Sequence, residues 1–165
     1  MQNDFIDGAL GTKEAAAIVP YVKEVIENFD GKVLFTRDTH FENYMETAEG
    51  KKLPVIHCVK NTNGWLLNKE VEKALEGRDA VKVEKLTFGS VDLPKLIKES
   101  AGDEDFDITL IGLCTDICVV SNALILKASF PEKDIYVDSS CCAGVTVNTH
   151  NAALETMKMC QINVE

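Results

Sequence analysis

The sequence predicts an α/β fold with a mainly parallel sheet, and two observations lead to this prediction. Short apolar stretches typical of buried strands alternate with stretches whose apolar residues recur at helical spacing. No internal repeat, low-complexity tract or linker interrupts the alternation. Such alternation places the strands side by side in parallel, joined by right-handed crossovers. At 165 residues, 45% of them hydrophobic, the chain fits one domain around a single core.

Each predicted element rests on its own pattern. A helix over about residues 18–29 has apolar residues at helical spacing, accepts Pro20 in its first turn, and ends at Asp30-Gly31. The strands predicted after it are KVLFTRD (32–38), AVKVEK (80–85), FDITLIGL (106–113), DIYVDSS (134–140) and INVE (162–165). The further helices predicted are residues 66–75, closed by Gly77, then 92–100, 116–128 and 148–160. A long polar loop is expected between the first strand and the second helix.

Composition excludes several classes of protein. A net charge of −10 and a pI near 4.8 argue against binding to nucleic acid and leave small neutral or cationic ligands open. No run of residues is apolar for the length of a membrane span, and no signal peptide is visible. The six cysteines lie in apolar segments without the regular spacing of a disulfide-rich domain. We therefore expect reduced thiols in a cytoplasmic protein.

Ligands of parallel α/β sheets bind beyond the carboxyl ends of the strands, which directs attention to three places. The stretch GLCTDICVV puts Cys118 in the first turn of a helix, where the positive helix end and free backbone N–H groups favour a thiolate and can hold an oxyanion. The alternative is a small buried hydrophobic side chain. Lys85 also ends a strand, where it either enters the cleft beside a thiolate or is simply solvated.

A second cluster combines oxygen and nitrogen ligands. Asp38 and His40 alternate at a strand end and so converge on one point, and Glu49 and His57 on the following loop can close the set. This mixture suits Zn, Mn or Fe and does not choose among them. The alternative is a surface loop with an ion pair at the strand end.

Five stretches together resemble the isochorismatase-like cysteine hydrolases, most closely their nicotinamidase/pyrazinamidase branch. They are QNDFIDGAL near the start, FTRDTH with a later HCV, Lys85 shortly before FGS, GLCTDICV, and VDSSCCAG. They occur in the family's order and cover nearly the whole chain. The resemblance implies a three-layer α/β/α, Rossmann-like fold with one hydrolase domain over residues 1–165, and a homo-oligomer acting on a small amide.

The resemblance also implies roles for individual residues. Cys118 matches the nucleophile and Lys85 the lysine of the catalytic triad. A cis peptide is implied at Leu113-Cys114, with the backbone N–H groups of Cys114 and Cys118 as the oxyanion hole. Phe5 matches an aromatic residue of the substrate pocket, which Leu113 is also expected to line. The metal ligands matched are Asp38, His40 and His57.

Two departures from the family pattern affect these expectations. Many nicotinamidases have a further histidine six residues after the DxH histidine, where this chain has Glu46. Other members use a glutamate shortly before the final histidine, so we favour Glu49 as the fourth ligand, with Glu46 as the second choice.

The second departure concerns the start of the chain. The family motif reads Asp-x-Gln-Asn-Asp-Phe, and Met1 occupies the x, so the acid/base aspartate would directly precede Met1. Asp4 is expected to accept local backbone hydrogen bonds instead. We therefore expect that the first, central strand is missing from this chain and that the domain is N-terminally truncated. A chain that truly began at Met1 would fold poorly and show little or no amidase activity.

The resemblance points to hydrolysis of nicotinamide to nicotinate and ammonia through a thioester, as part of NAD salvage, with one divalent metal ion. The alternatives are another hydrolase of the family, acting on a carbamoyl, ureido or isochorismate-type substrate, or a catalytically inactive binding protein. A redox pair of Cys114 and Cys118 is weaker, because three residues separate them instead of the two of a CxxC motif.

Overall fold

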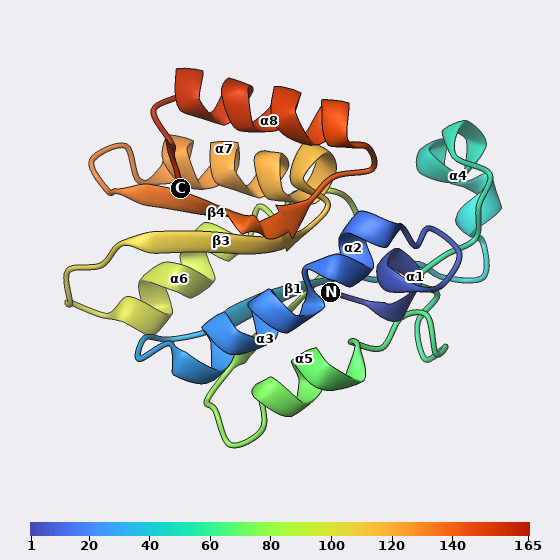
Figure 1. Cartoon of the computed structure of the whole chain (residues 1–165), viewed down its shortest axis with the longest axis horizontal. Helices are drawn as coiled ribbons and strands as arrows, with labels where there is room; N and C mark the ends of the chain where they lie inside the picture. Colours follow the sequence, from blue (N-terminus) through green and yellow to red (C-terminus); the bar gives the residue numbers. More distant parts are fainter.

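Five parallel strands form the centre of the structure, a computed structural model that describes residues 1–165 (Figure 1). They are β1 (Leu34–Asp38), β2 (Val81–Lys85), β3 (Ile108–Leu113), β4 (Ile135–Ala143) and β5 (Asn163–Val164). The strands belong to two separate sheets, one with the order β1-β2 and the other β3-β4-β5. All five lie within or beside the segments that the sequence predicts as strands, and the parallel pairing is confirmed.

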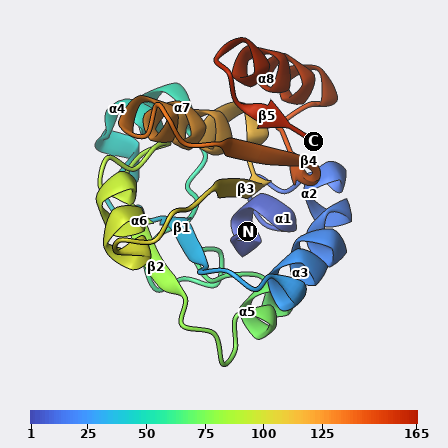
Figure 2. The same cartoon turned by 90° about the vertical axis from the view of Figure 1, so that its left-hand side faces the viewer.

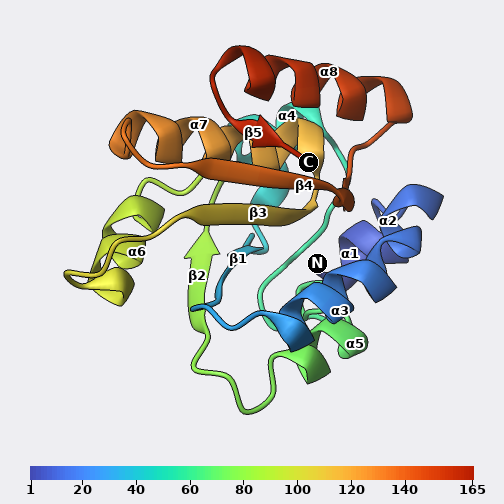
Figure 3. The ribbon, with the colours of Figure 1, turned by 60° about the vertical axis from the view of Figure 1, so that its left-hand side comes forward.

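Helices cover these strands on two sides and complete the three layers expected. The helices are α1 (Asn3–Ile6), α2 (Lys13–Ala17), α3 (Val19–Asn28), α4 (Ala48–Lys52), α5 (Lys69–Ala74), α6 (Leu93–Ala101), α7 (Val120–Ser129) and α8 (Val147–Met159). One apolar cluster joins α6, α7 and α8 to β2 and β4, and another joins α1, α3 and α5 to the end of β4. Figure 3 shows α7 and α8 on one side of β4, with α3 and α5 on the other side of the molecule. None of the helices combines the length and apolar character needed to cross a membrane.

Local sequence explains where the longer helices begin. Val22 and Ile26 of α3 are buried at helical spacing, and Pro20 lies in the first turn, where its missing N–H leaves no hydrogen bond unmade. Thr146 begins α8 with a capping box, since its hydroxyl accepts from the Thr149 N–H while the Thr149 side chain accepts from Thr146.

Three details differ from the sequence-based expectation. The predicted helix over 116–128 begins with a π-helical turn at Thr115–Val119 before regular α-helix starts at Val120. Strand β4 continues through Ala143 and therefore contains Cys141 and Cys142. The long polar loop after β1 includes a 3₁₀ turn, Tyr44–Glu46, and helix α4. Apolar periodicity does not distinguish π from α turns, and short capped helices in polar segments leave no apolar stripe.

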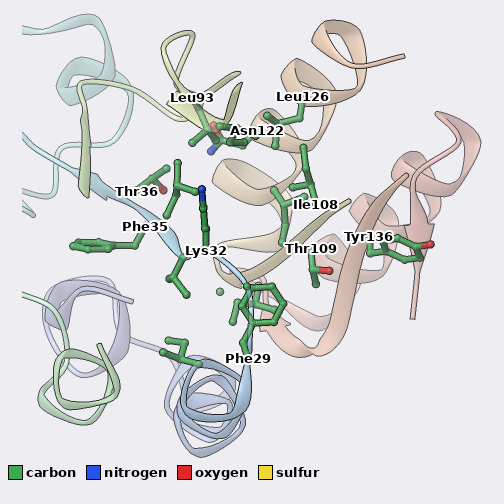
Figure 4. A pocket seen from close by; sticks show the side chains of 18 of the residues that line it. Phe29, Lys32, Phe35, Thr36, Leu93, Ile108, Thr109, Asn122, Leu126 and Tyr136 are labelled. Atoms are coloured by element: carbon green, nitrogen blue, oxygen red, sulfur yellow. The ribbon is translucent and has the colours of Figure 1, made fainter. Parts of the chain in front are cut away.

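A cavity separates the two sheets, with a volume of about 920 Å³ and mostly hydrophobic lining. Figure 2 shows the separation, with the amino terminus between β1 and β3. Thr36 of β1 and Thr109 of β3 lie on opposite sides of this cavity (Figure 4). At one end it reaches Met1, Leu113 and Cys118. The carboxyl ends of β1 and β3 therefore meet around one site although the strands are not paired with each other.

Candidate active site

The end of β3 places Cys118 at one end of the cavity between the two sheets. Leu113 and Cys114 are joined by a cis peptide bond, as the resemblance implied, and the π-helical turn that follows carries Cys118. The turn is held by the Cys114 carbonyl, which accepts from the N–H groups of Ile117 (3.1 Å) and Val119 (3.0 Å). The Cys118 side chain is buried, and Asn122 fixes the next turn by donating to the Cys118 carbonyl at 2.8 Å.

Lys85 approaches the thiol from the end of β2. Its Nζ lies 3.4 Å from the Cys118 Sγ, donates to the Thr87 carbonyl at 3.1 Å, and forms an ion pair with Asp38. Asp38 pairs with Lys85 in the β1–β2 register, so parallel pairing itself brings the two side chains together. The structure thus places Lys85 beside Cys118 and Asp38, with only 5% of its surface exposed. The solvated alternative is excluded.

Burial is the largest influence on the pKa of Cys118. Desolvation, followed by the negative charge of Asp38, raises the pKa of the thiol, whereas Lys85 and the Cys114 backbone N–H act to lower it. Burial acts to lower the pKa of Lys85, but the adjacent Cys118 and Asp38 outweigh it and raise that pKa. Desolvation thus opposes the effect of the helix end and of Lys85, which favour the thiolate, and it is the largest influence on this pKa.

Asp38 also belongs to a second group of side chains. Ligand atoms of Asp38, His40 and His57 lie within 4.8 Å of one another, and all three residues are buried. Glu49 joins them, with its Oε1 3.7 Å from the His40 Nε2 and 3.8 Å from the His57 Nε2. Glu46, the second choice as fourth ligand, is exposed and makes no such contact. The structure thus brings together the four residues favoured from the sequence.

The hydrogen bonding of the two histidines suits a metal. His57 Nδ1 is 2.8 Å from the Val55 carbonyl, which leaves Nε2 for the centre of the cluster. His40 Nε2 is buried and has no hydrogen-bond partner, an arrangement that is costly unless something else binds the nitrogen. Burial also lowers the pKa of His40 and so favours the neutral imidazole that coordinates metals. The donor set and the unpaired nitrogen therefore fit a divalent cation.

The remaining sequence-predicted residues lie around these two groups. The Phe5 ring packs edge-on against His57, with ring centroids 5.6 Å apart, and Leu113 lines the cavity next to Cys118. Asp4 accepts from the Ala9 N–H at 3.3 Å as expected, but its shorter bond, 2.7 Å, comes from the distant Cys58 N–H. The local hydrogen bond expected for Asp4 is confirmed, and the bond from Cys58 adds a partner that is distant in sequence. Asp38 lies 4.0 Å from the Cys118 sulfur, a contact that sequence reasoning missed.

Comparisons with known proteins give a matching domain family and several similar structures. The family model described as "Isochorismatase domain" matches residues 1–164. A zinc complex of pyrazinamidase from Pyrococcus horikoshii is similar, with 26% identity, coverage of 100% of this chain and 94% of that one, and a TM-score of 0.81. A nicotinamidase/pyrazinamidase from Bacillus subtilis has 25% identity, coverage of 99% and 93%, and a TM-score of 0.76. No curated protein matches the sequence.

A third solved structure supports the fold alone. It is an isochorismatase-like hydrolase from Alkaliphilus metalliredigens, with 23% identity, coverage of 99% of this chain and 89% of that one, and a TM-score of 0.81.

Proposed function

Because the chain belongs to the isochorismatase family, we propose that this hydrolase domain cleaves a small carboxamide, with nicotinamide as the substrate and nicotinate and ammonia as the products. The observation that carries the proposal is the position of Asp38, which links a lysine–cysteine pair to a cluster of metal-type ligands. The similarity to a pyrazinamidase and to a nicotinamidase/pyrazinamidase supports an amide of this size. In that role the protein would act in NAD salvage in the cytoplasm.

Cys118 is the proposed nucleophile. Its sulfur attacks the carboxamide carbon, and the backbone N–H groups of Cys114 and Cys118 hold the resulting oxyanion. The amide nitrogen takes up a proton and leaves as ammonia, so that a thioester remains on Cys118. Water then hydrolyses the thioester and releases the carboxylate and the free thiol. Lys85 stabilises the thiolate that attacks, because its ammonium group is 3.4 Å from the sulfur.

The thiol proton needs an acceptor before attack, because the thiolate is the attacking form and burial raises the pKa of the Cys118 thiol. The resemblance assigns this role to an aspartate directly before residue 1, and that assignment remains a prediction. Within residues 1–165, Asp38 presents a carboxylate 4.0 Å from the sulfur while it pairs with Lys85.

Asp38, His40, Glu49 and His57 would hold one divalent metal ion, for which Zn, Mn and Fe are all suitable. When bound, the ion would supply a Lewis acid that orients the ring nitrogen of the substrate, directly or through water. Phe5 supports this placement, since its ring lies against His57 and so offers an apolar wall beside the ligands. The residues of the chain then position the carboxamide in front of Cys118.

Ammonia release from nicotinamide tests the proposal. We expect turnover by the wild-type chain extended upstream with an aspartate directly before residue 1, and none by Cys118→Ala in the same background. Cys160→Ala is the matched control, because this exposed cysteine lies outside the site and its loss should leave turnover unchanged. Absence of ammonia release from the extended wild-type protein would rule out the nicotinamidase assignment. Turnover by Cys118→Ala would rule out the mechanism.

A further inference from the structure

The amino-terminal turn, Gln2 to Asp4, contacts every segment that carries a proposed metal ligand except the Glu49 helix. The backbone N–H groups of Asn3 and Asp4 donate to the carbonyls of Leu66 (2.9 Å) and Gly64 (3.1 Å). The side chains of Gln2 and Asp4 reach further, to the end of β1 and to the loop that carries His57. Neither side chain touches the ligand atoms themselves, so any effect on the site is indirect.

Gln2 holds the backbone of Asp38. Its Oε1 accepts from the Asp38 N–H at 2.8 Å, and its Nε2 donates to the Asp38 carbonyl at 2.8 Å and to the Trp65 carbonyl at 3.0 Å. The Gln2 carboxamide thereby makes the hydrogen bonds to Asp38, the last residue of β1, that a backbone peptide group of a neighbouring strand would make. With only 2% of Gln2 exposed, water does not compete for these bonds. Gln2 therefore fixes the one residue that faces both Lys85 and the histidines.

Asp4 holds the other side of the cluster. Its Oδ2 accepts from the Cys58 N–H at 2.7 Å, directly after His57, where the chain has a left-handed conformation with a φ of 47° at Cys58. A charged acceptor makes this a strong bond, which offsets the cost of an unusual backbone conformation. Gly64 leaves room for the Asp4 carboxylate, because a Cβ at position 64 would overlap it. Asp4 therefore fixes the peptide that carries His57.

We propose that Gln2 and Asp4 are positioning residues with separate targets, and this inference rests on the proposed function. Gln2 fixes the position of Asp38 and so affects both the metal ligands and the Lys85–Cys118 pair. Asp4 fixes the position of His57 and so affects the metal ligands alone. A merely structural role would not produce this division, because general loosening of the fold would change both groups together.

Two measurements on the metal-free protein separate the targets. One is zinc affinity by titration calorimetry, and the other is the rate at which iodoacetamide alkylates Cys118, followed by peptide mass spectrometry. We expect Asp4→Leu to weaken zinc binding roughly 10–100-fold, the usual effect of removing a group that orients a ligand. Its Cys118 alkylation rate should stay within about twofold of the wild type. Gln2→Met should change both quantities.

Three further variants control the experiment. Asp4→Asn keeps an oxygen that can accept from Cys58 and should restore most of the zinc affinity. Asn3→Ala removes the 2.8 Å bond from this side chain to the Asn63 carbonyl in the same turn and should change neither quantity. Gly64→Ala retains Asp4 but displaces its carboxylate, so it should repeat the zinc defect even if Asp4→Leu does not fold.

Equal zinc affinity in Asp4→Leu and Asn3→Ala would overturn the inference, as would parallel losses in both measurements for Asp4→Leu. Wild-type protein that does not bind zinc would refute it together with the metal cluster. If zinc binding follows the expected pattern but nicotinamide is not hydrolysed, the proposed substrate is wrong and the positioning roles stand.

Discussion

Lys85 connects the proposed nucleophile to the proposed metal ligands, because it contacts both the sulfur of Cys118 and the carboxylate of Asp38. The sequence indicated only that a lysine follows a strand. Its burial comes from the register of β1 and β2, in which Lys85 pairs with Asp38, and from the turn that brings Cys118 over both. A lysine in this position stabilises negative charge on sulfur.

Replacing Lys85 should slow the reaction of Cys118 with iodoacetamide. The ammonium group lowers the pKa of the thiol, so its removal in Lys85→Met raises that pKa further and reduces the thiolate fraction at pH 8. We expect a rate at least about tenfold lower, equivalent to one pKa unit. Lys82→Met is the control, because Lys82 lies on the same strand but is exposed. An unchanged rate in Lys85→Met would contradict the assigned role.

Glu84 should stabilise the fold in a pH-dependent way. Hydrogen bonds from Lys60 and the nearby Arg37 and Lys82 lower the pKa of this carboxyl from 4.5 to about 2. Because the folded-state pKa is depressed, the stabilisation is fully present above about pH 4.5 and is lost as the pH falls toward 2. Glu84→Gln should therefore reduce the free energy of unfolding by about 1 kcal/mol at pH 7, allowing for partial exposure.

Urea unfolding at pH 7 and at lower pH checks this dependence. The difference between Glu84→Gln and the wild type should shrink through this range and vanish near pH 2. Glu76→Gln, at an exposed position without an ion pair, should have no comparable effect. A difference that persisted unchanged in acid would mean that charge pairing is not its cause.

Among the elements, β1 has one edge that faces the cavity, and only some of the backbone N–H and C=O groups along this edge have hydrogen-bond partners. The Val33 carbonyl accepts from Val81 and the Thr39 N–H donates to Lys85, so alternate residues from Val33 to Thr39 face β2. The backbone groups of Leu34, Thr36 and Asp38 consequently face the other way. Those of Asp38 are bound by Gln2, whereas Thr36 lines the cavity.

Hydrogen exchange should reveal this alternation. The Thr36 amide, which faces the cavity, should exchange with deuterium at least about tenfold faster than the neighbouring Phe35 amide, which faces β2. Both lie in the same strand, so each serves as the control for the other. Amide exchange measured by NMR distinguishes them, and equal protection of the two would show that the cavity edge of β1 is paired.

Elements with a strong apolar pattern are the ones that the sequence predicts well. The parallel strands and the helices α3, α6 and α8 lie close to their expected ranges, because burial of one face sets both the pattern and the structure. The π-helical turn at Thr115–Val119 was missed, because it is specified by the geometry at the end of β3. Choosing Glu49 over Glu46 rested on family resemblance, and only the fold shows which carboxylate reaches the histidines.

At the scale of the whole molecule, the carboxyl ends of β1, β2 and β3 converge although they belong to two sheets. This convergence explains why site residues separated by 80 positions, Asp38 and Cys118, lie 4.0 Å apart. Residue types at strand ends indicated where to look, and the resemblance to a known family was needed to choose among their alternative roles. The upward shift of the Cys118 pKa was not predictable, because it depends on burial by segments that are distant in sequence.

The central claim is that Cys118 forms a thioester with the acyl group of a carboxamide. Acid quenching during turnover of nicotinamide by the chain extended with an aspartate directly before residue 1, followed by peptide mass spectrometry, tests it most directly. The account predicts a nicotinoyl group on the peptide that contains Cys118 and on no other cysteine peptide. Ammonia release at the normal rate with Cys118 never acylated would contradict it.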